Sequence, residues 1–232
     1  MEISLVRRAL RFLRPPNVDA RMLSVMRECL RPDFNCVDVG AHAGDVLREM
    51  CRFAPRGQHY AFEPLPELYR RLVQDFPRVR VFPYALGGKE GKAIFYRTLG
   101  RSGFSGLSPR WMEQTEAITV KLNKLDDLIP LPIHFLKIDV EGAELGVLRG
   151  AQRIISEYKP IIVFEHGLNA AEYYETRPEQ IYEFLSGYRI FPLGEKRNLS
   201  REQFVAEFYR NEIYDFLALP LDYPTSNTRL NQ

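Results

Sequence analysis

The stretch from Leu136 to Ala151 constrains the fold most strongly, because a buried strand, a polar turn and a helix follow one another in LKIDVEGAELGVLRGA. The pattern predicts a strand over Ile133–Val140 and a helix over Ala143–Ile155. Side chains alternate along a strand, so one face of this strand is expected to carry three ionisable groups: Lys137, Asp139 and Glu141.

Two interpretations of these ionisable groups are open. The carboxyl end of a strand in an open α/β sheet borders the ligand crevice, so the groups could serve a binding site. Alternatively, Lys137 and Asp139 form a structural ion pair. We favour a site, because ionisable groups on a buried strand are costly when nothing engages them.

Composition sets broad limits. A chain of 232 residues that are 45% apolar is long enough for one well-packed α/β domain with extensions. The net charge of +2 gives no reason to expect a nucleic-acid partner. Three cysteines without Cys-x-x-Cys spacing favour the reducing cytoplasm. No apolar run approaches the roughly 20 residues that span a bilayer, so no transmembrane segment is expected. The oligomeric state stays open, a homo-oligomer included.

Three parts are expected along the chain. Residues 1–33 form an N-terminal helical extension, with Asp19 as the N-cap of its second helix. Its first helix, Met1–Pro16, is basic and amphipathic, and it either packs on its own domain or lies on an anionic membrane surface. Residues 34–221 form the main domain, and residues 222–232 have the polar composition of a frayed tail.

Strands alternate with helical stretches through the main domain, which predicts a parallel sheet with helices on both faces. Beyond Ile133–Val140, such strands are expected over Asn35–Val39, Gln58–Phe62, Val79–Tyr84, Ile161–Phe164, Tyr188–Pro192 and Tyr214–Leu219. Besides Ala143–Ile155, helices are expected after Gly44 and over Pro66–Asp75, Pro178–Leu185 and Arg201–Glu207.

A long detour over Ala85–Pro132 interrupts this alternation. It holds two short strands, Lys92–Tyr96 and Ile118–Leu122, and a Gly- and Ser-rich loop over Leu99–Ser108. Long irregular excursions inside compact domains often serve as substrate loops. The loop therefore suits a lid over a polar acceptor, with a mobile surface loop as the alternative.

The sequence VDVGAHAG over residues 37–44 has the features of a cofactor-binding turn. Small residues let the backbone approach a ligand, and the following helix offers free N–H groups. Glu63 ends the next strand, where an acid can accept hydrogen bonds from ribose hydroxyls. The alternative is a glycine turn that serves only helix–strand packing.

The spacing of the glycines indicates which cofactor fits. Gly40 and Gly44 lack the middle glycine of a dinucleotide fingerprint. The acid Asp38 would repel a pyrophosphate, but it suits a ligand that carries sulfonium and ammonium groups. S-adenosylmethionine is such a ligand.

Five motifs, in this order, resemble the FkbM family of S-adenosylmethionine-dependent methyltransferases. They are VDVGAHAG (37–44), YAFEP (60–64), YALG (84–87), LDDL (125–128) and LKIDVEGAE (136–144). The resemblance spans residues 34–165, with a weaker likeness beyond. It implies an α/β class I methyltransferase (Rossmann-like) fold, in which the last strand of a seven-stranded, mostly parallel sheet is antiparallel. It also implies methyl transfer, usually to oxygen.

The resemblance further implies which residues hold the cofactor. In the first turn these are Asp38, Gly40, Ala41, His42 and Gly44, with Asp38, Gly40 and Gly44 around the methionine part. Glu63 would hold the ribose, and the adenine would lie near Ala85 and Leu86. His42 departs from the family pattern, because such proteins often have Asn at this position.

The acceptor is expected to be a small-molecule or glycan hydroxyl, on a sugar or a secondary metabolite. Asp139 and Glu141 end one strand, while Glu165 and His166 end the next, so these groups are expected to converge. They could bind Mg²⁺, with Asp139 and Glu165 as its ligands. In a metal-free site, His166 or Glu165 is the general base and Lys137 pairs with a carboxylate. A third interpretation is a buried structural network.

Two other functions compete with methyl transfer. A nicotinamide-dependent oxidoreductase on a Rossmann sheet is disfavoured, because the middle glycine and a Tyr-x-x-x-Lys pair are missing. The second competing function is that of a cofactor-binding module that has lost catalysis and serves as an interaction subunit. The acids at three strand ends argue against it.

Overall fold

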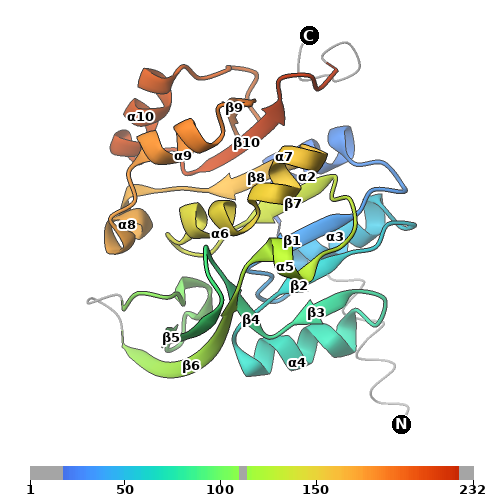
Figure 1. The fold of residues 1–232 in the computed structure, drawn as a ribbon, viewed down its shortest axis with the longest axis vertical. Coiled ribbons are helices and arrows are strands. Elements are labelled where there is room, and N and C mark those ends of the chain that lie inside the picture. The colour runs from blue at the N-terminus through green and yellow to red at the C-terminus, as the bar shows by residue number, and fades with distance from the viewer. Residues whose placement is uncertain (1–17, 110–113, 225–232) are drawn as a thin grey trace.

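The computed structural model describes residues 18–109 and 114–224. The basic helix expected over Met1–Pro16 lies outside the described residues, as does the tail beyond residue 224. The described residues form a large sheet with helices on both faces and a smaller sheet beside it (Figure 1).

Seven strands form the main sheet in the order β3-β2-β1-β7-β8-β10-β9. They are β1 (Cys36–Val39), β2 (Tyr60–Phe62), β3 (Arg80–Phe82), β7 (Phe135–Ile138), β8 (Ile161–Glu165), β9 (Tyr188–Pro192) and β10 (Asp215–Pro220). Only β10 pairs antiparallel, with β8 on one side and β9 on the other. The predicted seven-stranded, mostly parallel sheet with an antiparallel last strand is confirmed.

Helices cover both faces of this sheet. One face packs against α2 (Ala20–Cys29), α3 (Asp45–Phe53) and α4 (Pro66–Asp75). The other packs against α6 (Glu144–Gly150), α7 (Gln152–Tyr158), α9 (Pro178–Phe184) and α10 (Arg201–Arg210). Short α5 (Leu125–Leu128) adds to the second face, while α8 (Leu168–Ala171) follows β8. Asp19 is confirmed as the N-cap of α2, because its side chain accepts a hydrogen bond from the Arg21 N–H.

The prediction of one strand over Val79–Tyr84 was wrong. The main sheet takes only β3, and Tyr84 begins β4 (Tyr84–Leu86), which belongs to the smaller sheet. Pro83 separates them, and proline has no N–H to donate to a sheet ladder. The chain therefore changes sheets at this residue.

The prediction of one helix over Ala143–Ile155 was also wrong, since α6 and α7 are separate. Gly150 ends α6 where the backbone of Gly87 comes so close that a Cβ at Gly150 would lie 2.2 Å from the Gly87 oxygen. Asp126 then caps α7, because its carboxylate accepts the N–H groups of Arg153 and Ile154 at 2.7 and 3.0 Å. A side chain distant in sequence thus begins a new helix.

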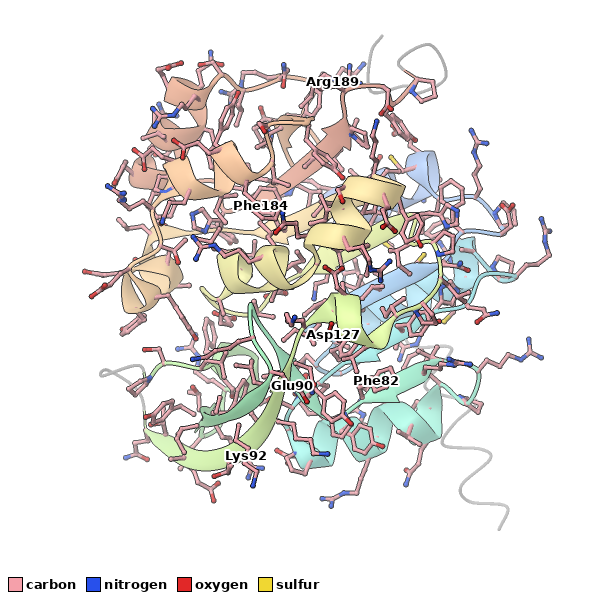
Figure 2. All side chains as sticks on the ribbon, viewed as in Figure 1. Phe82, Glu90, Lys92, Asp127, Phe184 and Arg189 are labelled. Carbon is pink, nitrogen blue, oxygen red and sulfur yellow. The ribbon has the colours of Figure 1, made fainter. Side chains whose placement is uncertain are left out.

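The detour forms the smaller sheet in the order β4-β6-β5, with β5 (Gly91–Thr98) and β6 (Thr115–Asn123) as a long hairpin. Both strands were predicted and are longer than expected. Aromatic rings join the two sheets. Phe82 of the main sheet, labelled in Figure 2, stacks on Phe62 with their ring centroids 5.1 Å apart, and its ring centroid lies 5.7 Å from that of Tyr84 in the smaller sheet. The loop between β5 and β6 is therefore carried on a sheet fixed to the main domain.

The strand order reverses between β1 and β7. After β1 the chain builds β2 and β3 on one side, and it later returns to place β7 on the other. Ligand crevices of open α/β sheets lie at the carboxyl ends of such strands. The fold thus places a site between the turn after β1 and the turn after β7.

Candidate functional site

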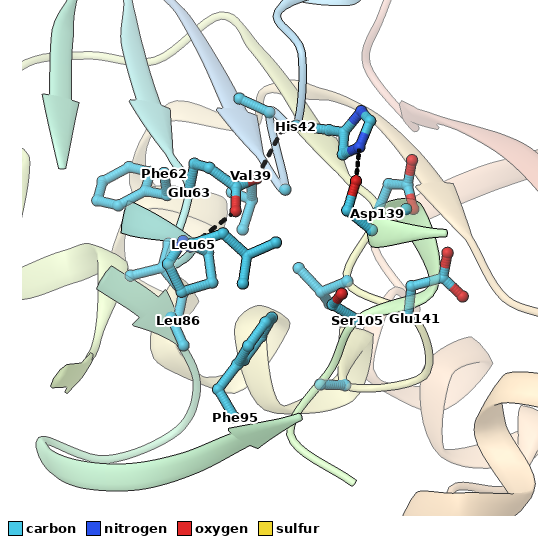
Figure 3. A pocket seen from close by; sticks show the side chains of 18 of the residues that line it. Val39, His42, Phe62, Glu63, Leu65, Leu86, Phe95, Ser105, Asp139 and Glu141 are labelled. Carbon is cyan, nitrogen blue, oxygen red and sulfur yellow. Dashed lines mark hydrogen bonds between the residues drawn. The ribbon is translucent and has the colours of Figure 1, made fainter. Parts of the chain in front are cut away.

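A cavity of about 350 Å³ lies at this reversal point, a size typical of small-molecule sites. Its walls come from the turns after β1, β2 and β7, from the end of β4, and from the loop between β5 and β6. Figure 3 shows Glu63, Leu65 and Phe95 on one side of the cavity, with Asp139 and Glu141 on the other. We call this space the site cavity.

Gly40 brings the two turns together. Its φ of 78° lies in the left-handed region, and a Cβ at this position would lie 1.8 Å from the backbone carbonyl oxygen of Asp139. The N–H groups of Gly40 and Ala41 both donate to the Phe62 oxygen at 3.1 Å. Gly40, Ala41 and His42, which were predicted to bind the cofactor, line the cavity, whereas Gly44, predicted with them, is the N-cap of α3 and is not one of the described lining residues.

Glu63 is buried at the end of β2, and its carboxylate is held by backbone groups. Its Oε2 accepts the His42 N–H at 2.8 Å, and its Oε1 accepts the Leu65 N–H at 2.9 Å. Burial raises the pKa of Glu63 to about 7, against the effect of these two hydrogen bonds. A carboxylate has about four lone-pair positions, so two remain for hydroxyl groups of a ligand in the cavity.

The wall beside Glu63 is apolar. Ala85 and Leu86, predicted near the adenine, line it together with Leu65 and Phe95. Leu65, Ala85 and Phe95 belong to one buried cluster. This wall suits the flat face of an aromatic ring.

Lys137 connects the turn after β1 with the turn after β7. Its ammonium lies 3.2 Å from Asp38 Oδ1 and 3.2 Å from Asp139 Oδ2, and it donates to the Gly40 oxygen at 3.0 Å. Burial would lower the pKa of Lys137, but the carboxylates of Asp139 and Asp38 outweigh it and raise that pKa. Asp38 is fully buried beneath the turn, outside the described lining of the cavity. The ion pair of Lys137 and Asp139 therefore exists, and both residues also border the cavity.

Three carboxylates meet at the other end of the cavity. Asp139, Glu141 and Glu165 each offer an oxygen, and these oxygens lie within 4.8 Å of one another. Burial and the neighbouring charges of Asp139 and Glu141 raise the pKa of Glu165 to about 10, so this group keeps its proton near neutral pH. The Lys137 ammonium and a hydrogen bond from Glu165 hold the pKa of Asp139 below its usual range, against the effect of burial. Asp139 is therefore the charged member beside a protonated Glu165.

The structure separates His166 from this group. Its buried ring stacks on Phe208 at 4.7 Å, and its Nδ1 lies 3.7 Å from Glu144 Oε2. His166 is not one of the described residues that line the cavity, whereas His42 is. The Nε2 of His42 is hydrogen-bonded to Ser102 Oγ at 2.8 Å.

Comparison with known proteins shows the family to which this chain belongs. The family model described as the methyltransferase FkbM domain matches residues 38–190 of this chain. The chain belongs to the FkbM methyltransferase family. This region includes every cofactor-binding residue predicted above, from Asp38 to Leu86, and both carboxylate-bearing turns.

The individual curated relatives of this chain are distant. The chain is 30% identical to the AMB antimetabolite synthetase AmbE of Pseudomonas aeruginosa, over 52% of this chain and 8% of that protein. It is 29% identical to the hexuronic acid methyltransferase AglP of Haloferax volcanii, over 56% of this chain and 54% of that protein. The chain thus matches about half, or much less, of the length of these relatives.

A solved FkbM structure has the same fold. The methyltransferase FkbM from Methylobacillus flagellatus superposes with a TM-score of 0.52 at 16% identity, over 92% of this chain and 58% of that one.

None of the helices within residues 18–109 and 114–224 combines the length and apolar character that crossing a bilayer requires.

Some lining residues of this FkbM chain were not predicted individually. Ser102, Phe104 and Ser105 come from the Gly- and Ser-rich loop, whose composition had indicated a lid. Phe95 comes from β5, and no local signal marks it, because only the packing of the smaller sheet brings it to the cavity.

Proposed function

We propose that this chain transfers a methyl group from S-adenosylmethionine to a hydroxyl of a sugar. The observation that carries the proposal is one cavity with a fixed carboxylate and an apolar wall at one end, and a cluster of three carboxyl groups at the other. Membership in the FkbM family supports methyl transfer, and the hexuronic acid methyltransferase relative supports a sugar acceptor.

The residues at the donor end fit the proposed cofactor. Glu63 would accept the ribose hydroxyls, and the wall of Leu65, Ala85 and Leu86 would take the adenine. Asp38 lies beneath the turn of Gly40 and His42, where it would hold, together with Lys137, the shape of the turn that receives the donor. Bound S-adenosylmethionine supplies an electrophilic methyl group on a sulfonium, which leaves as a neutral thioether once the acceptor oxygen has taken the methyl.

The residues at the acceptor end would position the hydroxyl and receive its proton. Asp139 is the group proposed for this role, because Glu165 already carries a proton and His166 lies away from the cavity. Lys137 fixes the orientation of Asp139 through their 3.2 Å contact. Positioning supplies much of the rate in such a displacement.

We propose a metal-free site. Oxygen ligands suit Mg²⁺, and Glu141 joins the two predicted ligands Asp139 and Glu165. However, the Lys137 ammonium lies 3.2 Å from Asp139 and already supplies a positive charge beside this carboxylate. Lys137 therefore serves in the place where a metal ion would otherwise balance the carboxylates.

Calorimetric titration with S-adenosylhomocysteine, S-adenosylmethionine and NAD⁺ tests the donor site. Binding of the first two and not of NAD⁺ is expected, and binding of NAD⁺ alone would overturn the proposal. Tritium transfer from labelled S-adenosylmethionine to free hexuronic acids, hexoses and their oligosaccharides tests the acceptor. Donor binding without transfer to any acceptor, including metabolite extracts, would favour the non-catalytic module.

A further inference from the structure

The first part of the loop between β5 and β6, residues 99–109, forms one wall of the site cavity and is called the loop below. Its 3-10 turn, η1 (Ser102–Phe104), and the following Ser105 and Leu107 all line the space. The sequence suggested a lid over the acceptor, yet Ser102 in this loop also contacts the turn after β1, through His42. This contact gives the loop a role that the composition alone did not define.

The loop is held firmly to the smaller sheet at its base. The Thr98 N–H donates to Ser105 Oγ at 3.0 Å, and the Thr98 hydroxyl donates to the Phe104 oxygen at 3.0 Å. Tyr96 and Gly106 exchange backbone hydrogen bonds of 2.8 and 3.1 Å. The loop is thus built to keep its shape while its tip meets the rest of the site.

The loop contacts two parts of the site. At the acceptor end, a Cβ at Gly106 would lie 2.9 Å from Tyr174 Oη, which follows β8, and 3.7 Å from Glu141 Cβ in the turn after β7. At the turn after β1, Ser102 Oγ is hydrogen-bonded to His42 Nε2 at 2.8 Å, on the side of the cavity where Figure 3 shows Asp139. The first contact is packing, whereas the second is a single polar bond between partly exposed groups.

His42 couples this bond to the donor site. Its backbone N–H donates to Glu63, the residue proposed to hold the ribose, and His42 itself lines the cavity. One residue therefore contacts the ribose-binding carboxylate through its backbone and the loop tip through its ring. The bond between His42 and Ser102 therefore joins the loop tip to the turn that also holds the Glu63 carboxylate.

We propose that Ser102 is a positioning residue that retains the bound donor, because its bond to His42 holds the loop tip to the turn after β1. The bond must open for the spent donor to leave, and it forms again over the next donor molecule. This inference rests on the proposed function, since it assumes that the S-adenosyl ligand occupies the end lined by Glu63. It assigns the His at position 42 a role in holding the loop.

Surface plasmon resonance on the immobilised full chain, with S-adenosylhomocysteine as the probe, tests the proposal without an identified acceptor. Ser102→Ala is expected to raise the dissociation rate about three- to tenfold, the range for losing one exposed hydrogen bond, with little change in association. Ser102→Thr keeps a hydroxyl and should restore slow dissociation. Ser108→Ala, in the same loop but outside the described cavity lining, is the matched control and should leave the rate unchanged.

A double-mutant cycle separates the bond from independent effects. His42→Asn keeps a residue that tolerates a positive φ, and it should also speed dissociation. If the two side chains act through their mutual bond, the double variant should release the ligand no faster than His42→Asn alone. Multiplying effects, an unchanged rate in Ser102→Ala, or slower association alone would overturn the proposal. A wild-type chain that binds no S-adenosylhomocysteine would instead contradict the proposed function itself.

Discussion

The Lys137 ammonium lies 3.2 Å from Asp38 Oδ1, and the two residues are register partners on β7 and β1. Neighbouring positions on parallel strands face the same side of the sheet, so a buried acid and a buried base meet beneath the site cavity. The same ammonium reaches Asp139 and the Gly40 oxygen. One buried cation therefore links the turn proposed to bind the donor with the carboxylates proposed to bind the acceptor.

Lys137→Met should strongly destabilise the protein, by about 3–5 kcal/mol, because it leaves Asp38 as an uncompensated buried charge. Urea unfolding followed by circular dichroism measures the effect. The double variant Lys137→Met with Asp38→Asn removes the buried charge and should recover part of the stability. Equal losses in the single and double variants would contradict an ion pair that balances Asp38.

Donor binding should depend on pH through Glu63. Only the carboxylate can accept hydrogen bonds at both oxygens, and burial raises its pKa to about 7. The dissociation constant of S-adenosylhomocysteine is therefore expected to be about tenfold higher at pH 6 than at pH 8, because only the ionised fraction binds well. Glu63→Gln should bind weakly at both pH values, whereas the exposed Glu90→Gln should behave as wild type. A wild-type affinity that does not vary with pH would move the ribose elsewhere.

In the free protein, Glu63 stabilises the folded state more at low pH than at high pH, whereas donor binding is expected to strengthen as pH rises. Its pKa is raised from 4.5 to about 7 on folding, so the folded state binds more protons than the unfolded state between these values. The stability contributed by this residue is full below pH 4.5 and is lost as pH rises through 7, by up to about 3 kcal/mol. Comparing unfolding of wild type and Glu63→Gln from pH 5 to 8 isolates this contribution. A difference that stays constant across this range would contradict the raised pKa.

Strand and helix positions were largely predictable, because apolar periodicity reports burial. The pattern could not show that Pro83 divides a strand between two sheets, because an apolar run does not indicate which strands pair with it. It also could not show that Asp126 starts a separate helix, because that carboxylate comes from a distant segment. Long-range contacts decided both cases.

The site was predictable where chemistry follows strand ends, and less so where side-chain direction matters. Glu165 and His166 are consecutive, so alternation sends them to opposite faces of the sheet. Glu165 reaches the cavity, while the His166 ring packs near Phe204 in the opposite core. The period of two already argued against both serving one site. Ser102 depended on how a long loop folds back, which no local pattern reports.

Asp139→Asn should impair methyl transfer much more than donor binding. The amide keeps the shape but cannot take a proton, so the rate is expected to fall about 10²- to 10⁴-fold. The affinity for S-adenosylhomocysteine, measured by calorimetry, should change little. Glu165→Gln keeps a donor toward Asp139 and should cost less. If Glu165→Gln is the more damaging variant, Glu165 and not Asp139 takes the proton.

Removal of divalent cations should leave methyl transfer unchanged. The Lys137 ammonium already lies 3.2 Å from Asp139, and the raised pKa of Glu165 leaves only part of the carboxylate cluster charged. Initial rates of tritium transfer after dialysis against EDTA, with and without added Mg²⁺, measure the effect. Lys137→Met supplies a sharper comparison, because loss of the ammonium frees the carboxylates to attract a cation. Stimulation of the wild type by Mg²⁺ would show that Asp139, Glu141 and Glu165 serve as metal ligands despite the neighbouring lysine.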